Sequence, residues 1–136
     1  RAEGMPGLKE NYGLDVPAKN YIAISDGGGP ATVRALTDGT VTAANIYSTS
    51  PAIAEKNLVI LEDPKNNFLA ANVVPLVSSQ KKSDPLKTVL DAVSAKLTTE
   101  DLIKLNTETT GNSGINPDEA ARNWVQDNGF DEPLQP

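Results

Sequence analysis

Four short segments of the chain have the composition expected of β-strands. In residues 20–25, isoleucines alternate with tyrosine, alanine and serine, as they do in a half-buried strand. Residues 41–47 and 58–61 are further strand candidates, and residues 73–77 are a fourth. Pro75 lies inside the fourth segment, and because proline cannot donate a ladder hydrogen bond it favours an edge or crossing position.

Helical signals separate the first three of these segments. Residues 26–29 break the first strand, and Pro30 suits the first position of a helix that runs to about Leu36, with Gly39 as its C-terminal cap. Residues 50–54 begin with Ser-Pro and predict a short helical turn. The resulting β-α-β-α-β order predicts an α/β fold, with a parallel or mixed sheet covered by helices.

The last third of the chain carries stronger helix signals. Ser83 to Pro85 predicts a helix start, Thr98 to Asp101 resembles a capping box, and Asn116 to Glu119 caps a third helix that Gly129 ends. Residues 107–114 are predicted to be a polar loop. The first of these helices has one apolar stripe, formed by Leu86, Val89, Leu90, Val93 and Leu97.

Composition and charge exclude several classes of function. The chain has 136 residues, enough for one ordinary core, and contains neither cysteine nor histidine. It therefore lacks thiol nucleophiles, thiolate or imidazole metal sites and the usual general base, and we expect no enzyme, no metal and no cofactor. A net charge of -6 argues against nucleic acid or an anionic membrane surface as a partner. No stretch approaches the roughly 20 apolar residues of a membrane span.

Three places in the chain invite a chemical interpretation. The glycine-rich stretch Asp26 to Gly29 precedes a helix and could offer backbone N–H groups to an anion, but a tight strand-to-helix turn is the favoured reading. Tyr47 ends a predicted strand, where the ligand crevice of α/β sheets lies, yet a surface tyrosine on an edge strand explains it equally well. Trp124 lies on a helical stripe, which favours a core position over a binding cage.

An ordered set of short motifs resembles a known family. The set extends over residues 1–130 and resembles the second half of an osmoprotectant-type substrate-binding protein, the glycine betaine, choline and carnitine class that serves ABC importers. Its elements are Arg1 to Leu8 with Tyr12-Gly13, Asp38-Gly39, Ile46 to Ile53, Leu58 to Asp63, Asn72 to Pro75, Lys96 to Leu102, Asn116 to Arg122 and Gly129-Phe130.

The resemblance implies a two-lobed architecture of the type II periplasmic-binding-protein kind. Residues 1–71 would form most of lobe 2 of the substrate-binding domain. Residues 72–136 would form the crossing strand and the C-terminal helices that return to lobe 1 and pack there. The N-terminal half of the receptor, with the export signal, would then be missing. Exposed apolar surface on such a fragment predicts self-association or strand exchange.

The resemblance also implies how a ligand is held. A quaternary ammonium group is bound by aromatic faces, and an arginine pairs with a carboxylate tail. By position, Arg1 resembles the carboxylate-binding arginine, Tyr47 resembles a cage tyrosine, and Thr49 is a weaker candidate from the same stretch. Family members often carry a Pro-Pro-Tyr-Tyr-like stretch where this chain reads Leu-Ala-Ala-Asn, so Asn72 offers a polar contact instead of a cage aromatic. Either the ligand is less cationic, or further aromatic residues come from the absent half.

The function that follows is transport without chemistry. We expect an extracytoplasmic solute-binding component of an ABC importer that carries a small zwitterionic or cationic solute to a membrane permease. The alternative is a ligand-sensing module of the same fold, fused to a channel or signalling protein. Upstream and downstream sequence would discriminate, since a signal sequence and lipid-attachment cysteine favour the importer. An enzyme on this scaffold, such as a porphobilinogen-deaminase-like protein, requires a cysteine that this chain lacks.

Overall fold

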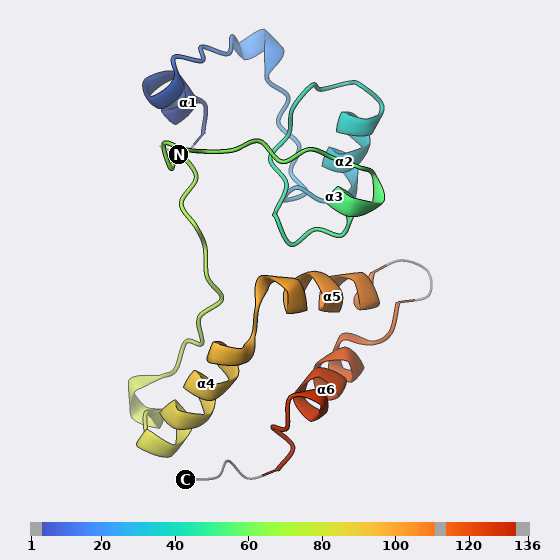
Figure 1. Cartoon of the computed structure of the whole chain (residues 1–136). Helices are drawn as coiled ribbons and strands as arrows, with labels where there is room; N and C mark the ends of the chain where they lie inside the picture. Colours follow the sequence, from blue (N-terminus) through green and yellow to red (C-terminus); the bar gives the residue numbers. More distant parts are fainter. Residues whose placement is uncertain (1–3, 111–113, 133–136) are drawn as a thin grey trace. The chain divides into compact units, whose positions relative to one another are not determined.

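The computed structural model describes residues 4–110 and 114–132, which divide into two compact units. The first unit comprises Arg1–Ser48 with Ala52–Ala71, and the second comprises Thr49–Pro51 with Asn72–Pro136. The helices of both units are labelled in Figure 1. None of the helices in the described ranges combines the length and the apolar character needed to cross a bilayer.

The first helix of the first unit was not expected from the sequence. Helix α1 spans Met5–Tyr12 and has a proline in its first turn, where the missing N–H costs no helical hydrogen bond. It ends at Gly13, which has a left-handed φ of 69° and donates its N–H to the Lys9 carbonyl, while the next N–H, of Leu14, donates to the Leu8 carbonyl. Proline near the start and glycine past the end were thus available as signals.

The other two helices of the first unit follow the sequence prediction. Helix α2 spans Pro30–Thr37, begins at the expected proline, and is followed by Gly39 at φ 74°. It buries Thr32 and Val33 on its inner face. Helix α3 is the expected helical turn and covers Ala52–Glu55. A 3₁₀ turn at Ala18–Asn20 lies between α1 and α2.

The second unit contains the three predicted C-terminal helices, α4 (Asp84–Lys96), α5 (Thr99–Thr109) and α6 (Pro117–Asp127), after a 3₁₀ turn at Ser79–Lys81. Their predicted caps are confirmed. The Ser83 and Asn116 side chains accept hydrogen bonds from the first turns of α4 and α6, at 3.4 and 2.8 Å. The expected loop over residues 107–114 is wrong at its start, because α5 continues to Thr109.

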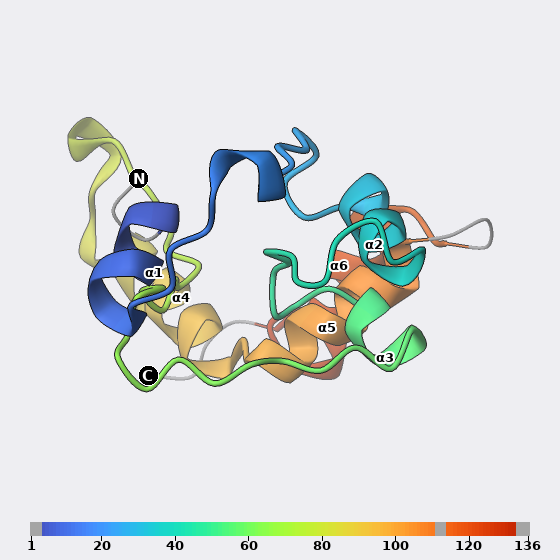
Figure 2. The ribbon, with the colours of Figure 1, turned by 90° about the horizontal axis from the view of Figure 1, so that it is seen from above.

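Helices α5 and α6 pack on each other and form the best-defined tertiary contact of the second unit (Figures 1 and 2). Ala120 lies at this contact with 1% of its surface exposed. The Trp124 ring stacks on Phe130 with ring centroids 5.9 Å apart, so the tryptophan is a packing residue of this unit. The ring is half-buried, so it packs beside this contact and not in the fully buried core position that the sequence favoured.

The predicted strands are the main correction to the sequence analysis. The described residues contain no β-strand: Asn20 ends the 3₁₀ turn, and residues 21–25, 41–47, 58–61 and 73–77 are irregular chain. A strand requires a neighbouring segment for its ladder of hydrogen bonds, and apolar alternation alone does not supply one. The apolar side chains of two of these segments face solvent, with Val59 84% and Leu76 94% exposed. The sheet of the expected α/β lobe is therefore absent from this part of the structure.

Candidate functional site

Tyr47 is the exposed aromatic residue of the predicted ligand site. It follows Ile46 at the end of an irregular segment in the first unit, and 71% of its surface is accessible. A tyrosine ring buried in a core could not meet a ligand, whereas most of the surface of this residue is accessible to one. An exposed tyrosine offers a π-face to a cation and a hydroxyl to a polar group.

The chain before Tyr47 lies against the glycine-rich turn. A Cβ atom added to Gly28 would lie 2.8 Å from the Asn45 carbonyl oxygen and 3.0 Å from the Ile46 Cα atom. Only glycine permits backbone segments to approach this closely, and Gly28 also has a left-handed φ of 80°. The turn and the two residues before Tyr47 are therefore in direct backbone contact.

The donors at the start of α2 are used by Asp26 itself. One carboxylate oxygen of Asp26 accepts the N–H groups of Ala31 and Thr32 at 2.8 and 3.0 Å, and the other accepts the Thr32 hydroxyl at 2.5 Å. The Thr32 hydroxyl and N–H are the main cause of a lowered pKa of Asp26. The side chain thus occupies the position that an anion would take, and the turn is structural, as the sequence favoured.

The remaining predicted site residues lie in the second unit or outside the described residues. Thr49 is half-buried and belongs to the second unit, where its carbonyl accepts a hydrogen bond from the Asn106 amide at 3.0 Å. Asn72 is exposed and also belongs to the second unit. Arg1 lies outside the described residues. Of the four predicted site residues, Tyr47 is therefore the one that the first unit presents as an accessible aromatic group.

A polar cluster around Tyr12 and Asp63 was missed by the sequence reasoning. The Tyr12 hydroxyl donates to Asp63 and accepts the Lys65 N–H at 2.9 Å. Asp63 also accepts the backbone N–H groups of Asn67 and Phe68, at 3.0 and 2.7 Å. The Asp63 pKa is lowered, first by the Phe68 N–H and then by the Tyr12 hydroxyl. Residues 63–67, Asp-Pro-Lys-Asn-Asn, have the composition of a turn, but this pattern does not reveal that Tyr12 is its partner.

The Lys65 side chain adds a positive charge to this cluster. Its ammonium group lies 5.4 Å from the centre of the Tyr12 ring and donates to the Asn11 carbonyl. The Asn11 amide in turn donates to the Asn67 side chain at 2.8 Å. One face of Tyr12 is therefore already occupied by a cation of the same chain, which distinguishes this ring from the open ring of Tyr47.

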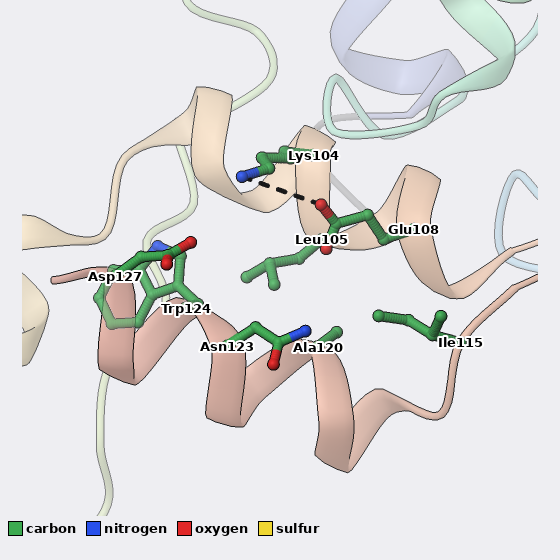
Figure 3. A pocket seen from close by; sticks show the side chains of 8 residues that line it. All are labelled: Lys104, Leu105, Glu108, Ile115, Ala120, Asn123, Trp124 and Asp127. Carbon is green, nitrogen blue, oxygen red and sulfur yellow. Dashed lines mark ion pairs between the residues drawn. The ribbon is translucent and has the colours of Figure 1, made fainter. Parts of the chain in front are cut away.

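A small cavity of about 180 Å³ lies between α5 and α6 in the second unit. Figure 3 shows its lining, which is Lys104, Leu105, Glu108, Ile115, Ala120, Asn123, Trp124 and Asp127. The Lys104 ammonium and the Glu108 carboxylate pair across one turn of α5 at 3.8 Å. The apolar wall and the internally paired charges are typical of a packing gap between two amphipathic helices.

The hydrogen bonding of the Trp124 indole N–H beside this cavity is incomplete. Hydrogen bonds from the Thr98 backbone and side chain lower the pKa of Asp101, and the Trp124 indole adds to that shift. Its Nε1 atom is nevertheless buried without a well-formed hydrogen bond to any described residue.

No group of three or more acidic side chains in the described part is placed to hold a metal ion.

Comparison with known proteins identifies the family. A model of the family described as the substrate binding domain of ABC-type glycine betaine transport system matches residues 1–127. That family has the periplasmic-binding-protein-type fold, and its members are binding proteins of ABC importers, not enzymes. No solved structure matches the chain. Because the match extends over nearly the whole length, this chain belongs to the family of substrate-binding domains of ABC-type glycine betaine transport systems.

Proposed function

We propose that this chain is part of the extracytoplasmic solute-binding component of an ABC importer for a quaternary-ammonium osmoprotectant such as glycine betaine, choline or carnitine. The family match supports the transport system, and the exposed ring of Tyr47 is the observation that carries the ligand class. An aromatic face attracts a cation that cannot donate strong hydrogen bonds, as is the case for a trimethylammonium group.

In this proposal the ligand residues have different tasks. Tyr47 forms one wall of the cage, and Arg1 pairs with the ligand carboxylate. Thr49 and Asn72 supply polar contacts, Asn72 in place of a cage aromatic. The carbonyl of Thr49 accepts a hydrogen bond from the Asn106 amide, and we assign the contact with the ligand to the Thr49 hydroxyl. The permease of the importer is the protein partner.

The lobe assignment is part of the same proposal. Residues 1–71 are assigned to lobe 2, and residues 72–136 to the segment that returns to lobe 1. The exposed apolar side chains of residues 58–61 and 73–77 support an α/β sheet that contains these segments, because helices packed on its faces would cover these side chains. Circular dichroism of the full-length gene product tests this, because an all-helical spectrum would contradict it.

Self-association of the isolated 136-residue chain is the second expected consequence.

The experiment that tests the ligand class is calorimetric titration of the full-length gene product with glycine betaine, choline, carnitine and proline. We expect saturable binding of at least one of the three quaternary ammonium solutes and much weaker binding of proline. Binding of proline alone, or of none of the four, would contradict the proposed ligand class while leaving the family assignment unchanged.

A further inference from the structure

We propose that Gly28 is a positioning residue for Tyr47, so that the turn over residues 26–29 sets the place of the aromatic wall without touching the ligand. The inference rests on the proposed function, because it presumes that Tyr47 meets a quaternary ammonium group. It adds a residue whose role no resemblance or composition had indicated.

The first step is the close approach of the two backbones. A Cβ atom at position 28 would meet the Asn45 carbonyl oxygen at 2.8 Å and the Ile46 Cα at 3.0 Å. Both atoms are main chain, so the contact could not be relieved by rotating a side chain. The Asn45–Ile46 segment would have to shift, and Tyr47 follows it directly along the chain.

The second step is that the turn on the other side of the contact is held in place. The Asp26 carboxylate accepts the Ala31 and Thr32 N–H groups and the Thr32 hydroxyl, and Thr32 itself is buried on α2. The Gly29 N–H also donates to the Asp26 carbonyl at 3.2 Å. A turn anchored to a helix in this way resists displacement, so an added side chain would move the Asn45–Ile46 segment more readily than the turn.

The third step is that Tyr47 has little else to hold it. Its surface is 71% exposed, so few side-chain contacts fix the position of the ring. The backbone just before it therefore determines where the ring lies. A displacement of that backbone moves the aromatic wall relative to any ligand that the other residues hold.

A matched control exists one residue earlier. Gly27 has a similar left-handed φ of 65°, but a Cβ atom there would meet nothing within 4 Å. Gly27→Ala and Gly28→Ala thus share the conformational strain of alanine at positive φ, and only Gly28→Ala displaces the Asn45–Ile46 segment. The difference between the two variants isolates the positioning effect.

The test measures glycine betaine affinity of the full-length gene product by calorimetry, in wild type, Gly27→Ala, Gly28→Ala, Tyr47→Ala and the Gly28→Ala/Tyr47→Ala double variant. We expect Gly28→Ala to weaken binding by up to the loss in Tyr47→Ala, roughly 2- to 30-fold, and Gly27→Ala to bind as wild type. In the Tyr47→Ala background Gly28→Ala should cost nothing further, because there is no ring left to misplace.

A merely structural role for Gly28 predicts a different pattern. Gly28→Ala would then weaken binding equally with and without Tyr47, or Gly27→Ala would match it, and either result overturns the inference. If wild type binds no quaternary ammonium solute, the proposed function fails first, and the outcome is distinguishable from a failure of the inference alone. Should Gly28→Ala not fold by circular dichroism, Asp26→Ala replaces it in the same cycle, because it releases the turn that braces this segment. Additive losses for Asp26→Ala and Tyr47→Ala would again contradict the inference.

Discussion

The hydroxyl of Tyr12 donates a hydrogen bond to the carboxylate of Asp63, 51 positions further along the chain. This bond joins the end of α1 to the turn after residues 58–61 and is reinforced by the Lys65 N–H, which donates to the same hydroxyl at 2.9 Å. The first unit has few buried side chains, so we expect this hydrogen bond between distant segments to contribute strongly to its stability. It follows that the first unit depends on a polar tether as well as on apolar burial.

The tether can be removed without removing the ring. Tyr12→Phe keeps the aromatic face beneath Lys65 but leaves the Lys65 N–H without its acceptor and Asp63 without one donor. We expect a lower Tm in thermal unfolding followed by circular dichroism. Tyr21→Phe is the matched control, because Tyr21 is 54% exposed and lies outside this cluster. Equal Tm values for the two variants would show that the tether does not stabilise the fold.

The same tether makes stability depend on pH in the acid range. The pKa of Asp63 lies below its ordinary value of 3.8, because the Phe68 N–H and the Tyr12 hydroxyl favour the charged carboxylate. A lowered pKa in the folded state contributes stability that is present above the ordinary pKa and is lost as pH falls through the folded-state pKa. We therefore expect Asp63→Asn to lower Tm at pH 7 and to change Tm less than wild type between pH 5 and acid pH. Parallel curves for the two proteins would contradict this.

Local signals in the sequence predicted helices well and strands badly. The caps at Ser83, Thr98 and Asn116 were visible because each depends on residues within one helical turn. The segments 58–61 and 73–77 have strand composition, but a strand also depends on a partner far away in the chain, and none is paired with them in the described residues.

At the candidate site, too, local features could be predicted from the sequence and contacts between distant segments could not. The hydrogen bonds of the Asp26 carboxylate support the structural interpretation of the turn, whereas the exposure of Tyr47 fits both a ligand-site residue and a surface tyrosine. The contact of Gly28 with Asn45, like the bond of Tyr12 to Asp63, joins segments far apart in the chain. The residues around Gly28 and around Tyr12 do not indicate which distant segment they contact, so neither contact could be predicted from the sequence.

The capping box of α5 provides a quantitative test of local structure. The Asp101 N–H donates to the Thr98 hydroxyl at 3.1 Å, and the Thr98 N–H donates to the Asp101 carboxylate at 2.9 Å. Thr98→Ala removes the first of these bonds, and we expect it to lower the free energy of unfolding by about 1 kcal/mol in urea titration. Thr107→Ala, near the end of the same helix, is the control and should change it much less. A loss in Thr107→Ala as large as in Thr98→Ala would contradict the role of the cap.

The Trp124 ring stacks on Phe130, and we expect the stability of the second unit to depend on this ring more than on its N–H. Trp124→Phe keeps an aromatic ring against Phe130 and removes a buried N–H without a well-formed bond, so we expect a loss of about 1 kcal/mol or less in unfolding free energy. Trp124→Ala removes the stacking and should cost about 3 kcal/mol, near the lower end for a large-to-small change because the side chain is only partly buried. Similar losses in the two variants would show that the stacking contributes little.

The most direct test of the central claim compares glycine betaine with its isostere 3,3-dimethylbutanoate, which keeps the carboxylate but has a neutral carbon in place of the ammonium nitrogen. Both are titrated by calorimetry into the full-length gene product, as wild type, Tyr47→Phe and Tyr47→Ala. If Tyr47 binds the cation through its ring, wild type and Tyr47→Phe bind glycine betaine more tightly than the isostere. Tyr47→Ala then binds glycine betaine roughly 2- to 30-fold more weakly than wild type does, while its affinity for the isostere changes little. Equal affinity of wild type for the two compounds, or an unchanged preference in Tyr47→Ala, would contradict the assignment of Tyr47 as a cation-binding wall.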